Sequence, residues 1–193
     1  MLKWFLRRQV AAFERTWNYD ASYIREIIDV DPRAMMAFGK VQGLSRYRKD
    51  VPLAAYCAAG LIAVMAEDCG PCTQLGIDMA QRQGVDPAIL RAIVARDYVA
   101  MPEDVALAAR FTEASLHHAP EADDLREEIL LRWGKRGLIS LAFAMLSART
   151  YPTLKYALGH GRACTRVVIG GETRPVRRDL TGANTIRTKT AAA

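Results

Sequence analysis

Two cysteines three positions apart carry the most distinctive chemistry in this sequence. They lie in the segment Glu67-Asp68-Cys69-Gly70-Pro71-Cys72, at the expected start of a helix. We expect Asp68 to cap that helix and Cys69 to occupy its first position, where unpaired backbone N–H groups and the helix dipole favour an anion. The pKa of a thiol falls there from about 8.5 toward neutrality, and only the thiolate attacks peroxides or disulfides. The pair therefore predicts redox chemistry, in which one thiol attacks and the other resolves.

Cys69 is predicted to be the more reactive thiol, because the first cysteine of such a pair is usually the more exposed one. Cys72 then completes the disulfide. Glu67, two residues before Cys69, is the best local candidate for a general base. The competing interpretation of Glu67 is a solvated carboxylate. Thr73 and Gln74 follow the pair and are either hydrogen-bond donors to it or ordinary surface residues.

Two other interpretations of the pair stay open. A zinc site has this cysteine spacing, but it needs two more ligands. The candidates are Cys57, Cys164 and His160, and no second paired motif accompanies them. The other interpretation is a pair of small buried residues without chemistry. We predict no metal and no cofactor, and we expect Cys57 to be a core residue and Cys164 to be incidental.

Length and composition restrict the class of protein. The chain has 193 residues and a net charge of +6, and about half of its residues are apolar, so one domain can bury roughly two thirds of its unfolded surface. The longest apolar run, residues 51–66, falls short of the roughly 20 residues of a membrane span. The first residues lack the order of a secretory signal, and four cysteines are too few for a disulfide scaffold. We therefore expect a cytoplasmic protein without a transmembrane segment.

The positive charge belongs to the two ends of the chain. Residues 1–17 carry +3 and residues 160–193 carry +5, whereas residues 18–159 carry −2. The basic tail has no aromatic residue on which a base would stack, and no helix-turn-helix signature is evident. We therefore predict no nucleic-acid partner and a solvated, partly disordered tail.

Hydrophobic periodicity predicts an all-α fold. Residues 1–159 are expected to form a single helical domain, and residues 160–193 the basic tail. The expected helices cover residues 2–17, 20–28, 32–47, 52–66, 69–83, 87–97, 102–117, 120–133 and 137–159. The last should kink at Pro152, which lacks an amide hydrogen. In the tail, Gly170-Gly171 indicates a short hairpin, and residues 181–193 are expected to be disordered.

The chain resembles the carboxymuconolactone decarboxylase family, in its AhpD-like (alkylhydroperoxidase) branch. The resemblance covers about residues 35–159. It depends on the buried apolar helix, the Cys-x-x-Cys at the next helix start, the stretch Gln81–Ile93 and the later apolar helix at 138–158. It implies an all-α fold that assembles as trimers or hexamers. It also implies that Cys69 and Cys72 act on a peroxide or on the disulfide of a partner protein.

The chain departs from the family pattern at the two proton-relay positions. The family's glutamate position falls on Cys57 and its histidine position on Gly76. General acid–base catalysis typically raises a reaction rate by a factor of about 10² to 10⁴. A site without these two residues would need another source for that rate enhancement. The tetrapeptide Cys-Gly-Pro-Cys also occurs in thioredoxin, but no βαβ pattern precedes it here.

Two further functions compete with a thiol oxidoreductase. A lyase of the decarboxylase branch would need the histidine that this chain lacks. A non-enzymatic helical oligomer would bind a partner, with the cysteine pair as a redox sensor. An oligomer is expected in any case, because residues 52–66 and 138–158 are very apolar for a small monomer.

Overall fold

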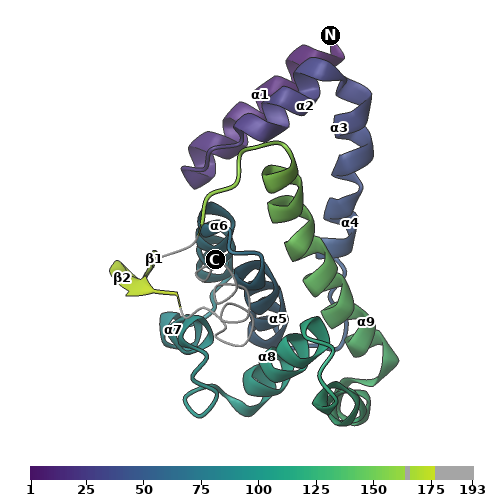
Figure 1. Ribbon diagram of the computed structural model, residues 1–193, viewed down its shortest axis with the longest axis vertical. Coiled ribbons are helices and arrows are strands. Elements are labelled where there is room, and N and C mark those ends of the chain that lie inside the picture. The colour runs from purple at the N-terminus through teal and green to yellow at the C-terminus, as the bar shows by residue number, and fades with distance from the viewer. Residues whose placement is uncertain (164–165, 177–193) are drawn as a thin grey trace, which may run out of the picture.

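The computed structural model describes residues 1–163 and 166–176, and these residues form an all-α fold with one small hairpin (Figure 1). The predicted fold class is thus confirmed. The helices, in chain order, are α1 (Leu2–Trp17), α2 (Ser22–Val30), α3 (Pro32–Gly39), α4 (Val41–Ser45), α5 (Leu53–Ala66), α6 (Gly70–Arg82), α7 (Pro87–Ala95), α8 (Glu103–Leu116) and α9 (Glu121–Ala157).

Helix α5 is the centre of the body. It is apolar on every side, as a helix surrounded by others must be, and Ile62 in its last turns is 1% exposed. Helices α6, α8 and α9 pack around it. Its alanines, Ala55, Ala58, Ala59 and Ala63, are fully buried and let these neighbours approach closely. The apolar surface of α5 is therefore buried by other helices of the same chain and needs no second subunit to cover it.

The N-terminal helices form a second, smaller cluster at one end of the molecule. Helices α1 and α2 lie side by side there, and α3 and α4 lead from them back to the body (Figure 1). Ile24 and Ile28 form the buried centre of this cluster, against Leu154 and Leu158 at the end of α9. The end of α9 thus joins the N-terminal helices to the body.

Two backbone interruptions divide the long helical stretches. The helix expected at 32–47 is broken at Lys40, whose N–H bonds the carbonyl of Ala37 in a tighter, three-residue turn. In α9 the break lies at Gly134, which has a φ of 65° that glycine adopts without strain. This break separates the two helical segments that the sequence predicts. The second segment runs through Pro152 to Ala157.

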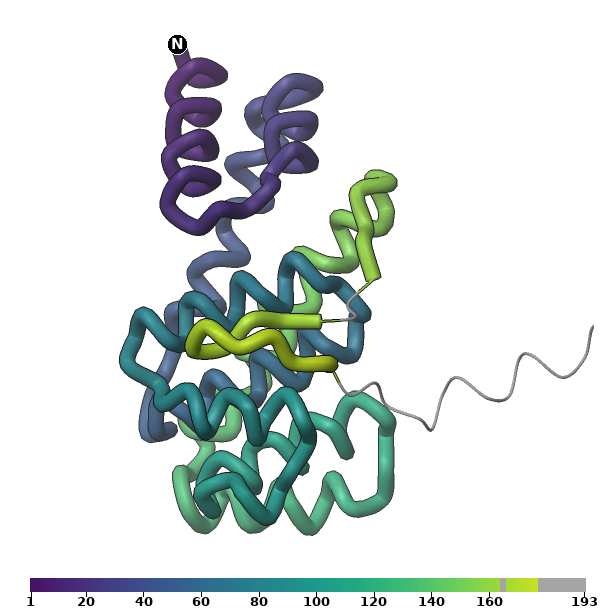
Figure 2. Tube along the Cα trace, turned by 90° about the vertical axis from the view of Figure 1, so that its left-hand side faces the viewer, coloured from purple at the N-terminus to yellow at the C-terminus, as the bar shows by residue number. Residues whose placement is uncertain are grey.

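The predicted hairpin is confirmed. Strands β1 (Arg166–Ile169) and β2 (Glu172–Pro175) are antiparallel, and Ile169 pairs with Glu172 across the turn. Gly170 and Gly171 both have positive φ, as a two-residue turn of this kind needs. The hairpin lies against α6 and α7 (Figure 2), and its residues Val167 and Ile169 join their core. The predictions for Cys164 and for residues 181–193 fall outside the described residues.

Candidate active site

The cysteine pair lies at the start of α6, one position later than expected. Cys69 is the N-cap, in extended conformation, and the helix begins at Gly70 with Pro71 in its first turn. Asp68 is not the cap, because its φ of 50° places it in the turn that follows α5. The predicted capping role of Asp68 is therefore wrong. Cys69 instead holds the position at which capping side chains accept hydrogen bonds.

Backbone contacts fix this helix start from both sides. The N–H and the hydroxyl of Thr73 each donate to the carbonyl of Cys69 over 2.9 Å. On the other side, the N–H of Gly70 donates to the carbonyl of Arg162, and the hydroxyl of Tyr156 donates to the carbonyl of Asp68. Residues 156–162 thus form a strap that lies against the N-terminus of α6.

Both sulfur-bearing residues are buried in the isolated chain. Cys69 has no exposed surface and Cys72 is 7% exposed, so the expectation of a more exposed first cysteine is wrong. The strap formed by residues 156–162 is the physical reason, because it bonds directly to the residues on either side of Cys69. In this conformation a reactant therefore does not contact Cys69 directly.

The two thiols have opposite pKa shifts. The pKa of Cys69 is lowered to about 7, chiefly because the Cys72 thiol hydrogen-bonds to its sulfur, with the backbone N–H of Cys72 and the charge of Lys155 adding to the effect. The pKa of Cys72 is raised far above its usual range, because Cys72 donates to the Cys69 thiolate and is buried. This pattern fits the assignment of Cys69 as nucleophile and Cys72 as resolver.

Three residues that the sequence analysis did not select surround the pair. The hydroxyl of Tyr19 lies 3.7 Å from the sulfur of Cys72. The ammonium of Lys155 lies 3.3 Å from the same hydroxyl, and 4.8 Å and 5.2 Å from the ring centroids of Tyr19 and Tyr23. All three side chains are buried. Burial raises the pKa of both tyrosines well above their usual range, so both stay protonated.

One of these residues had a signal in the sequence. The helical period that buries Leu141, Ala144 and Pro152 also puts Lys155 on the inner face of α9. A lysine at such a position is rarely buried without a specific partner. Tyr19 follows α1 in a short connection, and no local pattern indicates that it turns toward Cys72.

Glu67 is held away from a free catalytic role. Its carboxylate forms an ion pair with the guanidinium of Arg149, and its side chain is 18% exposed. Glu67 is therefore not the fully solvated carboxylate of the competing interpretation, and its charge is paired with that of Arg149. Its role as a general base stays a prediction. Arg149 is thus the partner of Glu67 in a salt bridge at the edge of the core.

The polar residues after the pair have structural partners. Thr73 is fully buried and bonds Cys69 through the backbone carbonyl rather than through sulfur. Gln74 donates to the carbonyl of Val168 and accepts from its N–H, so it ties the hairpin to α6. Beyond α9, His160 lies between Ser22 and Glu26, at 3.1 Å and 2.7 Å, with its ring 6.5 Å from that of Tyr23.

Gly76 and Cys57, the positions at which the resemblance predicts a proton relay, both contribute to packing here. A Cβ added at Gly76 would lie 3.1 Å from Cδ2 of Leu61, so α6 contacts α5 closely at this point. Cys57 is partly buried against the core of α5–α7, as expected, and burial raises its pKa to about 11. Glycine has no ionisable side chain and the Cys57 thiol stays protonated at neutral pH, so neither position supplies a general base.

The described residues contain no group of three or more His, Cys, Asp or Glu side chains placed to hold a metal ion. Within residues 1–163 and 166–176, no helix combines the length and the apolarity that a bilayer crossing needs.

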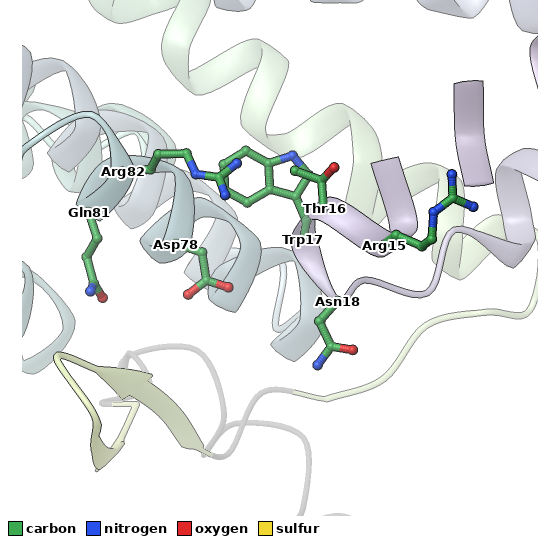
Figure 3. A pocket seen from close by; sticks show the side chains of 7 residues that line it. All are labelled: Arg15, Thr16, Trp17, Asn18, Asp78, Gln81 and Arg82. Carbon is green, nitrogen blue, oxygen red and sulfur yellow. The ribbon is translucent and has the colours of Figure 1, made fainter. Parts of the chain in front are cut away.

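A shallow pocket of about 300 Å³ lies between the end of α1 and α6 (Figure 3). The guanidinium of Arg82 stacks over the ring of Trp17 there, 4.3 Å from its centroid. Neither cysteine lines this pocket. The candidate active site is therefore the buried pair with its tyrosine and lysine neighbours, and not this opening.

Comparison of the chain with protein-family models, with curated proteins and with solved structures finds no match.

Proposed function

We propose that this chain is a thiol oxidoreductase in which Cys69 and Cys72 cycle between a dithiol and a disulfide. One observation carries the proposal. The two cysteines share the first turn of α6, with Cys69 at the N-cap, and the pKa of Cys69 is lowered there to about 7, chiefly by its hydrogen bond with Cys72, which favours the thiolate near neutral pH. A buried cysteine without chemistry has a raised pKa instead, as Cys57 has.

The electron balance of the reaction is that of a hydroperoxide reduction. The Cys69 thiolate attacks the hydroperoxide, the O–O bond breaks, and an alcohol leaves after taking a proton from solvent. Cys69 is then a sulfenic acid. The sulfur of Cys72 attacks it, the S–S bond forms, and water leaves with the proton of Cys72. A dithiol reductant restores the pair by thiol–disulfide exchange.

A partner-protein disulfide is the other substrate class. The Cys69 thiolate would then form a mixed disulfide and release one partner thiol, and Cys72 would resolve it and release the second. Burial separates the two classes, since Cys69 has no exposed surface and Cys72 is 7% exposed. A small hydroperoxide needs a smaller opening of the cover than a folded partner does. We therefore rank the hydroperoxide first.

The competing function is a non-enzymatic helical module that binds a partner and senses redox state. Its support is the exposed apolar surface of α1, where Trp4 and Phe5 are 65% and 52% exposed. In that case the pair would be oxidised without repeated turnover.

The test is stoichiometric peroxide consumption by the fully reduced protein. We expect wild type to consume one molecule of hydrogen peroxide per chain and to lose two hydrogens in mass, and a dithiol reductant to reverse this change. Cys69→Ser should abolish the reaction, Cys72→Ser should stop at the sulfenic acid, and the matched control Cys57→Ser should behave as wild type. Oxidation that occurs equally in Cys69→Ser would refute the proposal. Oxidation without turnover would favour the sensor.

A further inference from the structure

The ammonium of Lys155 is buried, and the carboxylate of Asp20, which interacts with it electrostatically, is itself exposed. Lys155 is 3% exposed, and among the described residues no Asp or Glu forms an ion pair with it. Its partners are the hydroxyl of Tyr19 and the faces of the Tyr19 and Tyr23 rings. A buried charge is costly unless an opposite charge lies near it. Solvent screens the charge of the exposed Asp20, so an anion within the buried region would stabilise Lys155 further.

The hydrogen bonds around Lys155 lead to that anion. An ammonium only donates, so the Lys155 hydrogen goes to the oxygen of Tyr19. This leaves the Tyr19 hydrogen for another acceptor, and the sulfur of Cys72, 3.7 Å away, shares it with the hydroxyl of Tyr23. The Cys72 hydrogen in turn goes to the sulfur of Cys69. Donors that all point one way along a chain polarise one another. The chain ends on Cys69, the thiol whose pKa is lowered.

We propose that Lys155 is a positioning residue of the cysteine pair. Its fixed positive charge acts through Tyr19 and Cys72 to hold Cys69 as a thiolate. The reduced pair is thereby stabilised relative to the disulfide, which has no anion for the ammonium to face. Lys155 thus sets the reduction potential of the pair from the far end of α9. The claim that Lys155 sets the reduction potential rests on the proposed redox function. The claim that Lys155 stabilises the Cys69 thiolate does not depend on it.

Other groups near the centre must be considered in a titration. The titratable groups that face it come from the N-terminal segment, from the start of α6 and from beyond α9, and they are Tyr19, Asp20, Tyr23, Asp68, Cys72 and His160. Both tyrosines stay protonated at neutral pH. Asp20 is already ionised, because its pKa is lowered chiefly by the backbone N–H of Ser22. The Cys69→Ser background keeps all of these groups except Cys69, so the difference between the two titrations reports Cys69 alone.

The experiment titrates the thiolate through its ultraviolet absorbance, which requires no reagent to enter the site. Each variant is compared with its own Cys69→Ser form. Lys155→Met keeps the length of the side chain and removes the charge. We expect the midpoint of Cys69 to rise by about one pH unit, which cuts the thiolate fraction at pH 7 about fivefold. Lys155→Arg should keep most of the thiolate, and Lys135→Met, an exposed lysine of the same helix, should change nothing.

The reduction potential gives the second readout, by equilibration with glutathione and its disulfide. At pH 9, where Cys69 is mostly thiolate in both proteins, we expect Lys155→Met to favour the disulfide about tenfold more than wild type, which corresponds to about −30 mV, and at pH 7 only about twofold more. Tyr19→Phe keeps the ring and breaks the chain, so it should move the titration in the same direction. If Lys155→Met fails to fold, the titration of Tyr19→Phe alone tests whether the hydrogen-bond chain stabilises the Cys69 thiolate.

The outcomes separate this inference from the proposed function. An unchanged thiolate titration in Lys155→Met and Tyr19→Phe overturns the inference. So does an equal shift in Lys155→Met and Lys155→Arg, since that result reports packing and not charge. A wild-type protein that never forms the disulfide refutes the proposed function, and the thiolate titration still decides the role of Lys155.

Discussion

The hydroxyl of Tyr19 lies 3.7 Å from the sulfur of Cys72, although 53 positions separate the two residues in the chain. The N-terminal segment is therefore part of the wall of the cysteine site. Phe13 of α1 packs edge-on against the Tyr19 ring, with centroids 5.9 Å apart, and fixes its position.

Removal of the Cys72 thiol should raise the pKa of Cys69. The hydrogen bond from Cys72 is the largest cause of the lowered pKa of Cys69. In Cys72→Ala we therefore expect the midpoint of thiolate formation to move from about 7 toward the ordinary 9.0. Cys72→Ser, whose hydroxyl still donates, should lie between the two. Ultraviolet titration measures this, and a midpoint near 7 in Cys72→Ala would contradict the assigned cause.

The stability of the reduced protein should depend on pH through the same pair. The pKa of Cys69 is about 7 in the folded chain and 9.0 by default, so its stabilisation is complete above pH 9 and is lost as pH falls through 7. The gain between pH 7 and 9 is at most about 2 kcal/mol in the free energy of unfolding. Above pH 9 the raised pKa of Cys72 acts in the opposite direction, because only the unfolded chain ionises there.

The measurement for this pH dependence is urea unfolding under reducing conditions from pH 6 to 10. We expect the difference between wild type and a Cys69→Ala/Cys72→Ala double variant to rise to a maximum near pH 9 and then to fall. The double variant serves as the control for every other titrating group. A difference that does not vary with pH would contradict the two assigned shifts.

Gly76 in α6 should resist substitution. A Cβ at Gly76 meets Leu61 at 3.1 Å, so Gly76→Ala should gain little or lose up to about 1 kcal/mol in spite of alanine's better helix propensity. Gly60→Ala in α5 is the matched control, since nothing lies within 4 Å of its Cβ. It should stabilise the protein by about 0.5–1 kcal/mol. Equal stabilisation of both variants in thermal unfolding would be the contrary result.

Glu67 and Arg149 allow a test of the predicted general base. If their ion pair is structural, Glu67→Gln should leave the rate of peroxide reduction within about threefold and cost at most about 1 kcal/mol in stability. Arg149→Gln should have a similar effect, and the double variant should add little to either. A loss in rate of 10²-fold or more, confined to Glu67→Gln, would instead establish the base.

Assembly into an oligomer stays a prediction, but the apolar surface that supports it is a different one from the surface that the sequence indicated. The apolar helix α5 is covered within one chain, so it does not itself require a partner. Exposed apolar side chains lie instead on α1 and α9, among them Trp4 and Leu146. We expect light scattering to report a trimer or hexamer, and Trp4→Glu to shift it toward smaller species if α1 takes part. A monomeric wild type would remove the prediction.

Local signals explain why much of the fold was predictable. The caps and prolines that begin α3 and α7 at Asp31-Pro32 and Asp86-Pro87 act within one turn, and Gly170-Gly171 defines a turn by its own backbone freedom. The start of α6 was displaced by one residue because Asp68 belongs to the turn after α5. That displacement depends on how α5 and α6 pack, which is not a local property.

The sequence by itself determined the helical class, the hairpin and the two thiols at a helix start, because periodicity, capping and Cys-x-x-Cys spacing are set by residues within a few positions of one another. Only the tertiary structure decided that both thiols are covered, that Arg149 holds Glu67, and that Tyr19 and Lys155 meet beside Cys72. Those contacts join residues up to 136 positions apart. They depend on long-range packing, in which the end of α9 fits between α6 and the N-terminal helices, and no local pattern encodes that packing.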